Sequence, residues 1–348
     1  MASQLRLDLD VLEQNADLMA SDLHVLGRRW RPHVKAHCQP LIATALLQRN
    51  ACGVTVATVS EAEVMAAAGM PSILLAHLVV TEDDRRRLAA VASQTELLLT
   101  IDHFVHAELL SQTATRTGQT LSVLVDVNVG MNRTGCRPRV DATQLALAAA
   151  GLPGLKVAGI MGYEGHLSRL RPESAKRQEI MEAMNALEQT RDSMLQRGLA
   201  CDIVSAGGSG TYRLTAQHPA VTELQCGGGI FGDPFYRDIC GLSGIQPALT
   251  VVADVVSRPS LTQAVLNCGR KAINPFIHPP EVLNPVGAEV DSLTAEHCVL
   301  TVSGAARDLK IGDQVTLAVG YSDHTILMHR EIHVFRGTEQ VDQWSVIR

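Results

Sequence analysis

The run Ile73-Leu74-Leu75-Ala76 is apolar at every position, and Val123-Leu124-Val125 has the same character. Strands that are buried on both faces carry continuous apolar runs, whereas strands with one face in water alternate between apolar and polar residues. Both runs therefore indicate central strands of a parallel sheet.

Eight short apolar or β-branched runs extend this pattern and alternate with helix-like segments. The candidate strands are His33–Ala36, Val54–Val59, Ile73–Ala76, Leu97–Ile101, Val123–Val129, Val157–Gly162, Ile203–Ser205 and Val221–Leu224. The candidate helices are Pro40–Gln48, Glu61–Ala68, Asp83–Ala92, Ala107–Thr115, Ala142–Ala150 and Ala175–Arg197. The spacing of Ser60 and Glu63 predicts a capping box at one helix start.

Eight strand-helix units over roughly 225 residues match the size of a (β/α)8 TIM-type barrel, so we predict this α/β fold. The interval after the seventh strand is short and is the weakest part of the pattern. A doubly wound open sheet is the alternative fold. It requires a Gly-x-Gly-x-x-Gly turn after the first strand, and the sequence has none there.

The pattern changes after about residue 245, where short strand-like runs are separated by Pro and Gly. These runs are Val251–Val256, Ala264–Leu266, Cys298–Val302, Gln314–Ala318, Thr325–Met328 and Ile332–Phe335. We predict a barrel over residues 10–245 and a smaller C-terminal all-β domain over residues 246–348. The first nine residues, which include the strand-like Leu5–Leu9, are candidates for a further strand of that domain.

The composition excludes several classes of protein. With 46% hydrophobic and 19% charged residues the chain is globular rather than disordered, and its net charge of −6 argues against a nucleic-acid partner. No apolar run reaches the roughly 18 residues of a membrane span, and the first residues lack the apolar core of a signal peptide. The eight cysteines are scattered without a Cys-x-x-Cys pair, which indicates a reducing, cytoplasmic location.

Two glycine-rich loops follow the last two predicted strands. In barrels of this kind the loops after strands seven and eight often bind phosphate, because glycines let backbone N–H groups approach an anion closely. Two tight turns without a ligand are the alternative interpretation. The pair of loops favours a phosphate-bearing ligand held by Gly207, Gly208, Ser209, Gly210, Thr211 and Gly228.

Lysine chemistry has few positions to choose from, because the chain contains only five lysines. Lys35 is the one predicted at the C-terminal end of a barrel strand, where active sites of such barrels lie. A salt-bridged lysine is the alternative. A lysine at the barrel mouth together with a phosphate site points to pyridoxal 5'-phosphate, which binds lysine as a Schiff base.

Further polar residues follow strands five and six. Arg133 lies in Gly130-Met131-Asn132-Arg133-Thr134-Gly135, and its planar guanidinium suits a phenolate or a carboxylate. Tyr163 and His166 lie in Gly162-Tyr163-Glu164-Gly165-His166. His166 is suited to packing on a flat ring or to acid–base chemistry.

Together these motifs resemble the fold-type III pyridoxal-phosphate family, whose best-known member is alanine racemase. The similarity is greater to its D-threonine aldolase and D-serine dehydratase-like branch, because Arg31-Pro32-His33-Val34-Lys35-Ala36-His37 resembles the lysine motif of that branch. The blocks Gly130–Gly135, Gly162–His166, Gly207–Thr211 and Glu296-His297 resemble further family motifs in family order, over nearly the whole chain.

The resemblance implies that Lys35 carries the cofactor, that Arg133 lies near its phenolic oxygen and that His166 packs near its ring. Tyr163 would belong to the same cofactor-binding block, and the two glycine loops would hold the phosphate. The resemblance also implies a homodimer, in which the β domain of one subunit closes the site of the other.

One segment departs from the branch, which usually binds a divalent metal through a histidine and then a Cys or Asp two residues later. Here Asp323 keeps the carboxylate, but Tyr321 stands in the histidine position. A phenol with a pKa of about 10 is a poor metal ligand at neutral pH. Asp323 and His297 are the remaining candidate ligands for a divalent metal.

We expect a lyase that cleaves or forms a D-configured β-hydroxy-α-amino acid, with glycine or a substituted glycine and an aldehyde as the other reactants. His297, His324 and Tyr321 are candidates for the base at the β-hydroxyl group. β-Elimination by a D-serine or hydroxyaspartate dehydratase is the alternative, and racemisation comes third. A non-catalytic pyridoxal-phosphate carrier is disfavoured, because carriers of this fold lack a β domain.

Overall fold

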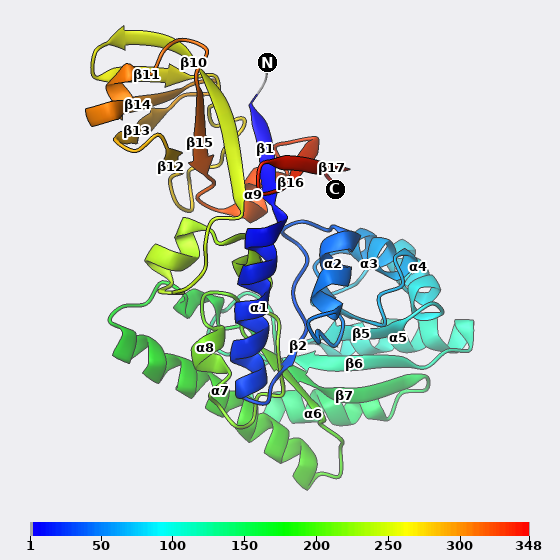
Figure 1. Ribbon diagram of the computed structural model, residues 1–348. Helices are drawn as coiled ribbons and strands as arrows, with labels where there is room; N and C mark the ends of the chain where they lie inside the picture. Colours follow the sequence, from blue (N-terminus) through cyan, green and yellow to red (C-terminus); the bar gives the residue numbers. More distant parts are fainter. Residues whose placement is uncertain (1–2, 348) are drawn as a thin grey trace. The chain divides into compact units, whose positions relative to one another are not determined.

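The computed structural model describes residues 3–347 and divides them into two compact units. One unit comprises the residues up to Met19 together with those from Gly228 onward, and the other is Ala20–Gly227. Figure 1 shows helices and parallel strands alternating in the unit Ala20–Gly227, whereas strands dominate the unit that includes the residues from Gly228 onward.

The unit Ala20–Gly227 is built on an eight-stranded sheet in the order β2-β9-β8-β7-β6-β5-β4-β3, in which every pairing is parallel. Parallel bridges between Trp30 and Ala51 and between His33 and Thr55 join the two ends of this order, so the sheet curls into a barrel. The strands are β2 (Arg29–Trp30), β3 (Val54–Val56), β4 (Ser72–Leu75), β5 (Glu96–Ile101), β6 (Leu121–Asp126), β7 (Leu155–Met161), β8 (Ile203–Ala206) and β9 (Glu223–Leu224). The predicted TIM-type α/β fold is confirmed.

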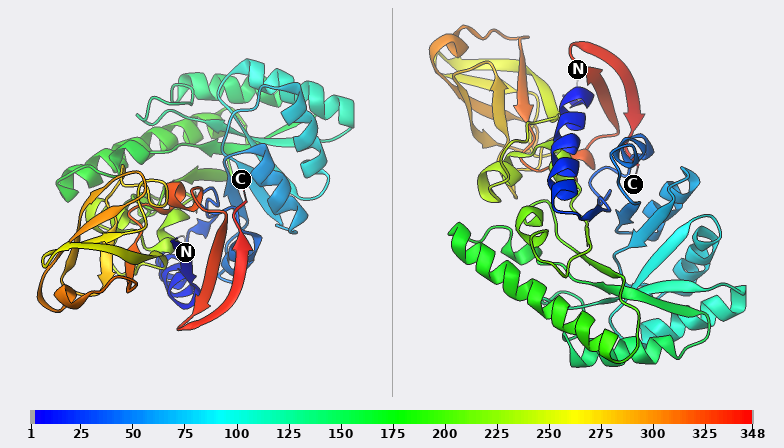
Figure 2. Two further views of the ribbon diagram at one scale, coloured as in Figure 1. Left: turned by 90° about the horizontal axis from the view of Figure 1, so that it is seen from above. Right: turned by 60° about the horizontal axis from the view of Figure 1, so that its bottom comes forward.

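Helices follow most of these strands, and Figure 2 shows α4 to α7 along the outer side of the sheet. The helices of the barrel unit are α2 (Pro40–Leu47), α3 (Val59–Ala67), α4 (Glu82–Ala92), α5 (Phe104–Thr117), α6 (Val140–Ala150), η1 (Gly165–Leu167), α7 (Glu173–Gln196) and α8 (Tyr212–Thr215). Helix α8 has only four residues, which explains the weak pattern after the seventh predicted strand.

The barrel strands are held together by buried aliphatic side chains. Five of these, from five neighbouring strands, form one cluster: Leu74, Leu98, Leu124, Met161 and Ile203. Fully burying such a side chain contributes about 1.5–3 kcal/mol to the free energy of unfolding. The continuous apolar runs of the sequence therefore supply this core.

Two local predictions in the barrel were wrong. The first strand is Arg29–Trp30 rather than His33–Ala36, because the chain turns after the single bridge of His33 with Thr55, with the Cys38 N–H donating to the Val34 carbonyl at 2.7 Å. The capping box is also shifted by two residues. Thr58 caps α3 by accepting from the Glu61 N–H at 3.1 Å, so the helix begins before Ser60.

The other unit contains a nine-stranded sheet, in which β13-β14-β11-β10-β1-β16-β17 is the main order and β15, with β12 beside it, also pairs with β10. Its strands are β1 (Gln4–Asp8), β10 (Leu249–Ser260), β11 (Gln263–Leu266), β12 (Glu281–Asn284), β13 (Ala288–Leu293), β14 (Cys298–Val302), β15 (Gln314–Ala318), β16 (Glu331–Arg336) and β17 (Glu339–Ser345). Its helices are the start of α1 (Leu9–Val25), η2 (Gly228–Phe231), η3 (Phe235–Ile239), η4 (Gly304–Asp308) and α9 (Ser322–Ile326).

The N-terminal segment joins this second sheet through β1, which pairs antiparallel with β10 and parallel with β16. Asn15 then ties α1 to two distant carbonyl groups, donating to Ile230 at 2.9 Å and to Gln246 at 2.7 Å. Its side-chain oxygen accepts from the Gln246 N–H at 2.9 Å. These bonds explain why residues up to Met19 fold with the residues from Gly228 onward.

The strand predicted over Thr325–Met328 was wrong, since Ser322–Ile326 form helix α9. None of the helices within residues 3–347 is long and apolar enough to cross a membrane.

Candidate active site

The lysine turn follows the first barrel strand and places Lys35 beside His33. The Lys35 backbone N–H donates to His33 Nδ1 at 3.3 Å, and the Lys35 side chain is exposed. Burial lowers the pKa of His33 well below its usual value, and the positive charges of Lys35, His37 and Arg133 lower it further. Lys35 and Arg133 therefore act on one imidazole, which stays neutral at physiological pH.

His37 is the second histidine of this turn and is almost fully buried. Its Nδ1 atom accepts from the Gln39 N–H at 2.9 Å, which fixes the ring. Burial lowers the pKa of His37 to about 3. The lysine motif Arg31–His37 contains both histidines, but the sequence alone did not assign a role to either of them.

The loop after β6 presents Arg133 on a backbone that its own side chains fix. Asn128 Oδ1 accepts from the N–H groups of Gly130 at 3.0 Å and Asn132 at 3.1 Å. Thr134 donates to Asp126 at 2.8 Å, and burial raises the pKa of that carboxyl group. Arg133 is exposed, so its guanidinium is available on a prearranged loop.

Tyr163 and His166 connect this loop to the first glycine loop. The Arg133 guanidinium carbon lies 5.6 Å from the centre of the Tyr163 ring. A β-carbon at Gly208 would lie 2.9 Å from the same ring, and one at Gly130 would lie 3.1 Å from His166 Nε2. Arg133, Tyr163, His166 and Gly208 therefore lie at one place in the barrel unit.

The glycine loop Gly207–Thr211 is fixed by a residue that sequence reasoning missed. Glu164 is fully buried and accepts from the Gly207 N–H at 3.2 Å and from the Thr211 hydroxyl at 2.6 Å. These two donors are thus already used within the protein. The Gly210 N–H, by contrast, has no hydrogen-bond partner within residues 3–347, so it is available to an anion. The signal for Glu164 was an acidic residue shortly after the apolar end of β7, inside a block already singled out.

The second glycine loop is divided between the two units. Gly227 lies against the lysine turn, because a β-carbon there would lie 2.1 Å from the His33 carbonyl oxygen. Gly228 belongs to the other unit, where a β-carbon would lie 2.6 Å from the Tyr236 hydroxyl group. The sequence singled out Gly228, whereas the close approach to the lysine turn requires Gly227 to be a glycine.

Tyr321 lies in an aromatic cluster of the unit that includes the residues from Gly228 onward. Its ring centre lies 5.4 Å from that of Phe235, 6.1 Å from that of Tyr236 and 5.2 Å from that of His324. The adjacent Ser322 donates to the buried Asp233 carboxylate from its N–H at 2.8 Å and from its hydroxyl at 2.7 Å. The turn that carries Tyr321 is therefore held by Asp233.

His297 lies between β13 and β14, whereas Asp323 lies in α9 of the same unit. His297 is exposed, and its N–H donates to the Thr294 hydroxyl at 3.2 Å. Asp323 is partly buried in α9. A phenol at position 321 beside one carboxylate does not fit the histidine-and-carboxylate pair expected for a divalent metal.

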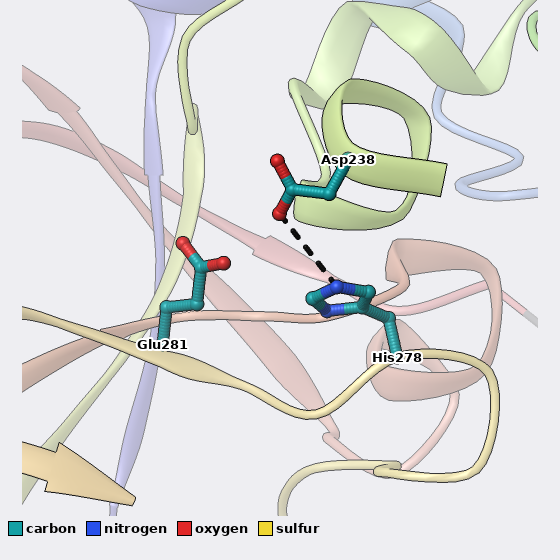
Figure 3. Close-up of side chains that lie close together, drawn as sticks. All are labelled: Asp238, His278 and Glu281. Carbon is teal, nitrogen blue, oxygen red and sulfur yellow. Dashed lines mark ion pairs between the residues drawn. The ribbon is translucent and has the colours of Figure 1, made fainter. Parts of the chain in front are cut away.

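A different group could hold a cation by its composition, and it is the one such group among residues 3–347. Asp238, His278 and Glu281 face one another in Figure 3, and His278 Nε2 lies 3.7 Å from the Asp238 carboxylate. Arg237 contacts both carboxylates, at 2.6 Å from Asp238 and 2.8 Å from Glu281, so its single positive charge is shared between them.

Comparison with protein families gives two matches. Residues 7–234 match the alanine racemase N-terminal domain, and residues 248–335 match a putative serine dehydratase domain. Together these matches cover both the barrel and most of the second sheet.

Individual relatives cover between 72% and 98% of this chain. A D-threonine aldolase of Arthrobacter sp is 30% identical, over 98% of this chain and 91% of its own length. A 3-hydroxy-D-aspartate aldolase of Paracoccus denitrificans strain Pd 1222 is 28% identical, over 93% of this chain and 86% of its own length. A D-threo-3-hydroxyaspartate dehydratase of Delftia sp. strain HT23 is 27% identical, over 72% of this chain and 66% of its own length.

Among solved structures, D-threonine aldolase from Filomicrobium marinum superposes with a TM-score of 0.93. It is 30% identical, and the match covers 99% of this chain and 94% of that one.

Proposed function

The chain belongs to the alanine racemase N-terminal domain family and is a pyridoxal-phosphate-dependent lyase of the D-threonine aldolase type, and from this premise we propose that it cleaves D-configured β-hydroxy-α-amino acids. The products are glycine, or a substituted glycine, and an aldehyde. The observation that carries this proposal is the gathering of Arg133, Tyr163 and the glycine loop around the barrel mouth that also carries Lys35.

The barrel residues fit pyridoxal 5'-phosphate. Gly208 lets the loop backbone approach the Tyr163 ring, from which a β-carbon would lie only 2.9 Å away, and Gly210 offers a backbone donor for a phosphate oxygen. Lys35 lies beside a neutral His33, and it is the residue that would hold the cofactor covalently. Bound pyridoxal phosphate supplies an electron sink for negative charge at the substrate α-carbon.

Around that group, Arg133 and His166 orient the ring, and residues Gly207–Thr211 with Gly228 hold the phosphate. The positive charge of Arg133 favours a deprotonated phenolic oxygen. His166 lies against Gly130 and packs on the ring face. Each of these roles is proposed from the family resemblance and from the local contacts.

Cleavage requires a base for the β-hydroxyl proton. As that proton leaves, the Cα–Cβ bond breaks, the aldehyde departs and the α-carbon takes up a proton to give glycine. We propose Tyr321 with His324, whose rings are in edge contact at 5.2 Å, as the pair that moves this proton. His297 is the remaining candidate and lies apart from them on another turn.

Tyrosine at position 321, in place of the metal-binding histidine of the branch, favours aldol cleavage over β-elimination. Expulsion of hydroxide depends on a Lewis acid or a strong proton donor at the β-oxygen, and the donor set here lacks the histidine of a metal pair. The Delftia dehydratase keeps elimination as the second candidate.

The working form of the enzyme, in this proposal, is a homodimer. The eight cysteines are free thiols, which supports a reducing, cytoplasmic location.

The deciding experiment incubates the protein with D- and L-threonine, D- and L-phenylserine, D-3-hydroxyaspartate and D-serine. We expect glycine and an aldehyde from the D-configured β-hydroxy acids alone. Ammonia and a keto acid from D-serine or D-3-hydroxyaspartate would establish the dehydratase instead. A coloured protein that releases no product from any of them would be a carrier.

A further inference from the structure

Lys176 is a lysine buried inside the barrel unit. It lies on α7 with 2% of its surface exposed, and its Nζ atom donates to the Gly210 carbonyl at 2.8 Å. Burying an ammonium group is costly, so buried lysines serve a specific electrostatic purpose more often than exposed ones. The carbonyl that it binds belongs to the glycine loop of the proposed phosphate site.

Glu164 binds the same loop as a buried negative charge. Its carboxylate accepts from the Gly207 N–H and from the hydroxyl groups of Thr211 and Thr215. A phosphate dianion at this loop would be repelled by that carboxylate, since buried charges are poorly screened. A cation on the same loop is needed to offset the repulsion.

We propose that Lys176 is an electrostatic positioning residue of the phosphate site. Its ammonium offsets the charge of Glu164, and its bond to the Gly210 carbonyl anchors the residue whose N–H is open to the anion. The inference rests on the proposed function, because the anion is the phosphate of pyridoxal phosphate. It assigns a role to a lysine that touches neither the substrate nor the reacting atoms.

The test compares two probes that differ only in the phosphate group. Apoprotein is titrated with pyridoxal 5'-phosphate and with pyridoxal, and binding is followed by absorbance. In Lys176→Met we expect the dissociation constant for pyridoxal phosphate to rise about tenfold or more, with that for pyridoxal unchanged. Lys176→Arg keeps the charge and should restore most of the affinity. The control is Lys156→Met, which removes an exposed lysine from the same unit and should change neither constant.

A second measurement leaves Lys176 in place and covers the case that its variants do not fold. Glu164→Gln removes the opposing charge, so it should tighten pyridoxal phosphate relative to pyridoxal. The double variant Lys176→Met with Glu164→Gln should return toward the wild-type ratio of the two constants.

If Lys176→Met lost affinity for pyridoxal phosphate and for pyridoxal to the same extent, its role would be purely structural and the inference would be overturned. Unchanged affinity for pyridoxal phosphate would overturn it as well. Should the variant not fold, an unchanged ratio in Glu164→Gln overturns it. A wild-type protein that binds neither probe would refute the proposed function itself, which distinguishes the two failures.

Discussion

Arg31 and Glu223 form an ion pair inside the barrel, with Arg31 Nε donating to Glu223 Oε1 at 3.0 Å and side-chain exposures of 3% and 0%. Arg31 also donates to the Ser72 hydroxyl at 2.7 Å. The pair joins the segment after β2 to β9, its neighbour in the sheet.

Glu223→Ala should therefore leave a buried guanidinium without its carboxylate and lower the free energy of unfolding by about 3–5 kcal/mol. Urea denaturation measures this change. The matched control is Glu82→Ala, which breaks the exposed pair with Arg116 at 2.9 Å and should cost less than about 1 kcal/mol. Equal losses in the two variants would show that burial of the Arg31 pair does not matter.

Lys35 should be the covalent attachment point of the cofactor. The protein loaded with pyridoxal phosphate is expected to absorb visible light, and borohydride should fix the cofactor to one peptide. Mass spectrometry of the digest then identifies the lysine. An adduct on Lys271, which is exposed and pairs with Glu296, would refute the assignment.

Gly208 should tolerate no side chain, because a β-carbon would lie 2.9 Å from the Tyr163 ring. We expect Gly208→Val to fold and to lose at least about tenfold in affinity for pyridoxal phosphate. Gly151→Ala is the control, since its β-carbon would meet nothing closer than 3.5 Å. Full cofactor affinity in folded Gly208→Val would identify the loop as an ordinary turn.

Activity should respond little to chelators, because Tyr321 stands where a histidine ligand is expected. Tyr321→His, by contrast, should create a response to added Mn²⁺ or Zn²⁺, whereas Tyr321→Phe should not. Turnover with and without chelator measures this for all three proteins. A wild-type enzyme that loses all activity in chelator and regains it with metal would mean that other residues complete a metal site.

Stability should fall in acid through His37. Its pKa is lowered to about 3 by burial, so the unfolded chain takes up a proton near its ordinary value of 6.5 that the folded chain refuses. The contribution of His37 to the free energy of unfolding is then complete above pH 6.5, and about 2 kcal/mol of it is lost by pH 5.

Denaturation at pH 7 and pH 5 tests the effect of His37. His37→Asn keeps an acceptor for the Gln39 N–H without the titrating ring, so its pH dependence should be smaller by that amount. An identical pH dependence in both proteins would contradict the prediction.

The sequence predicted the strands correctly where a single hydrophobic pattern marks them. The barrel strands carry continuous apolar runs, so seven of the eight were found near their observed bounds. The first was displaced because the chain turns after the bridge of His33 with Thr55, so the apolar residues of the lysine turn do not extend the strand. Strands β12, β13 and β17 were missed because few of their side chains are buried, so they are recognised only by their partners.

The candidate site shows the same limit. The motif residues Arg133, Tyr163 and His166 were found because they follow strands. Glu164 and Lys176 were not assigned, since their roles depend on contacts with a loop more than thirty positions away in the chain. Only the folded barrel brings these charges to one loop.

The two hydrogen bonds from Ser322 to Asp233 have an evolutionary consequence. Both hydrogen bonds involve the backbone or side chain of residue 322, so the shape of the turn does not depend on the side chain at position 321. Codons for tyrosine and histidine differ by a single nucleotide. A lineage can therefore exchange one for the other at Tyr321 in one mutational step without rebuilding the turn, and reaction chemistry can diverge on an unchanged scaffold.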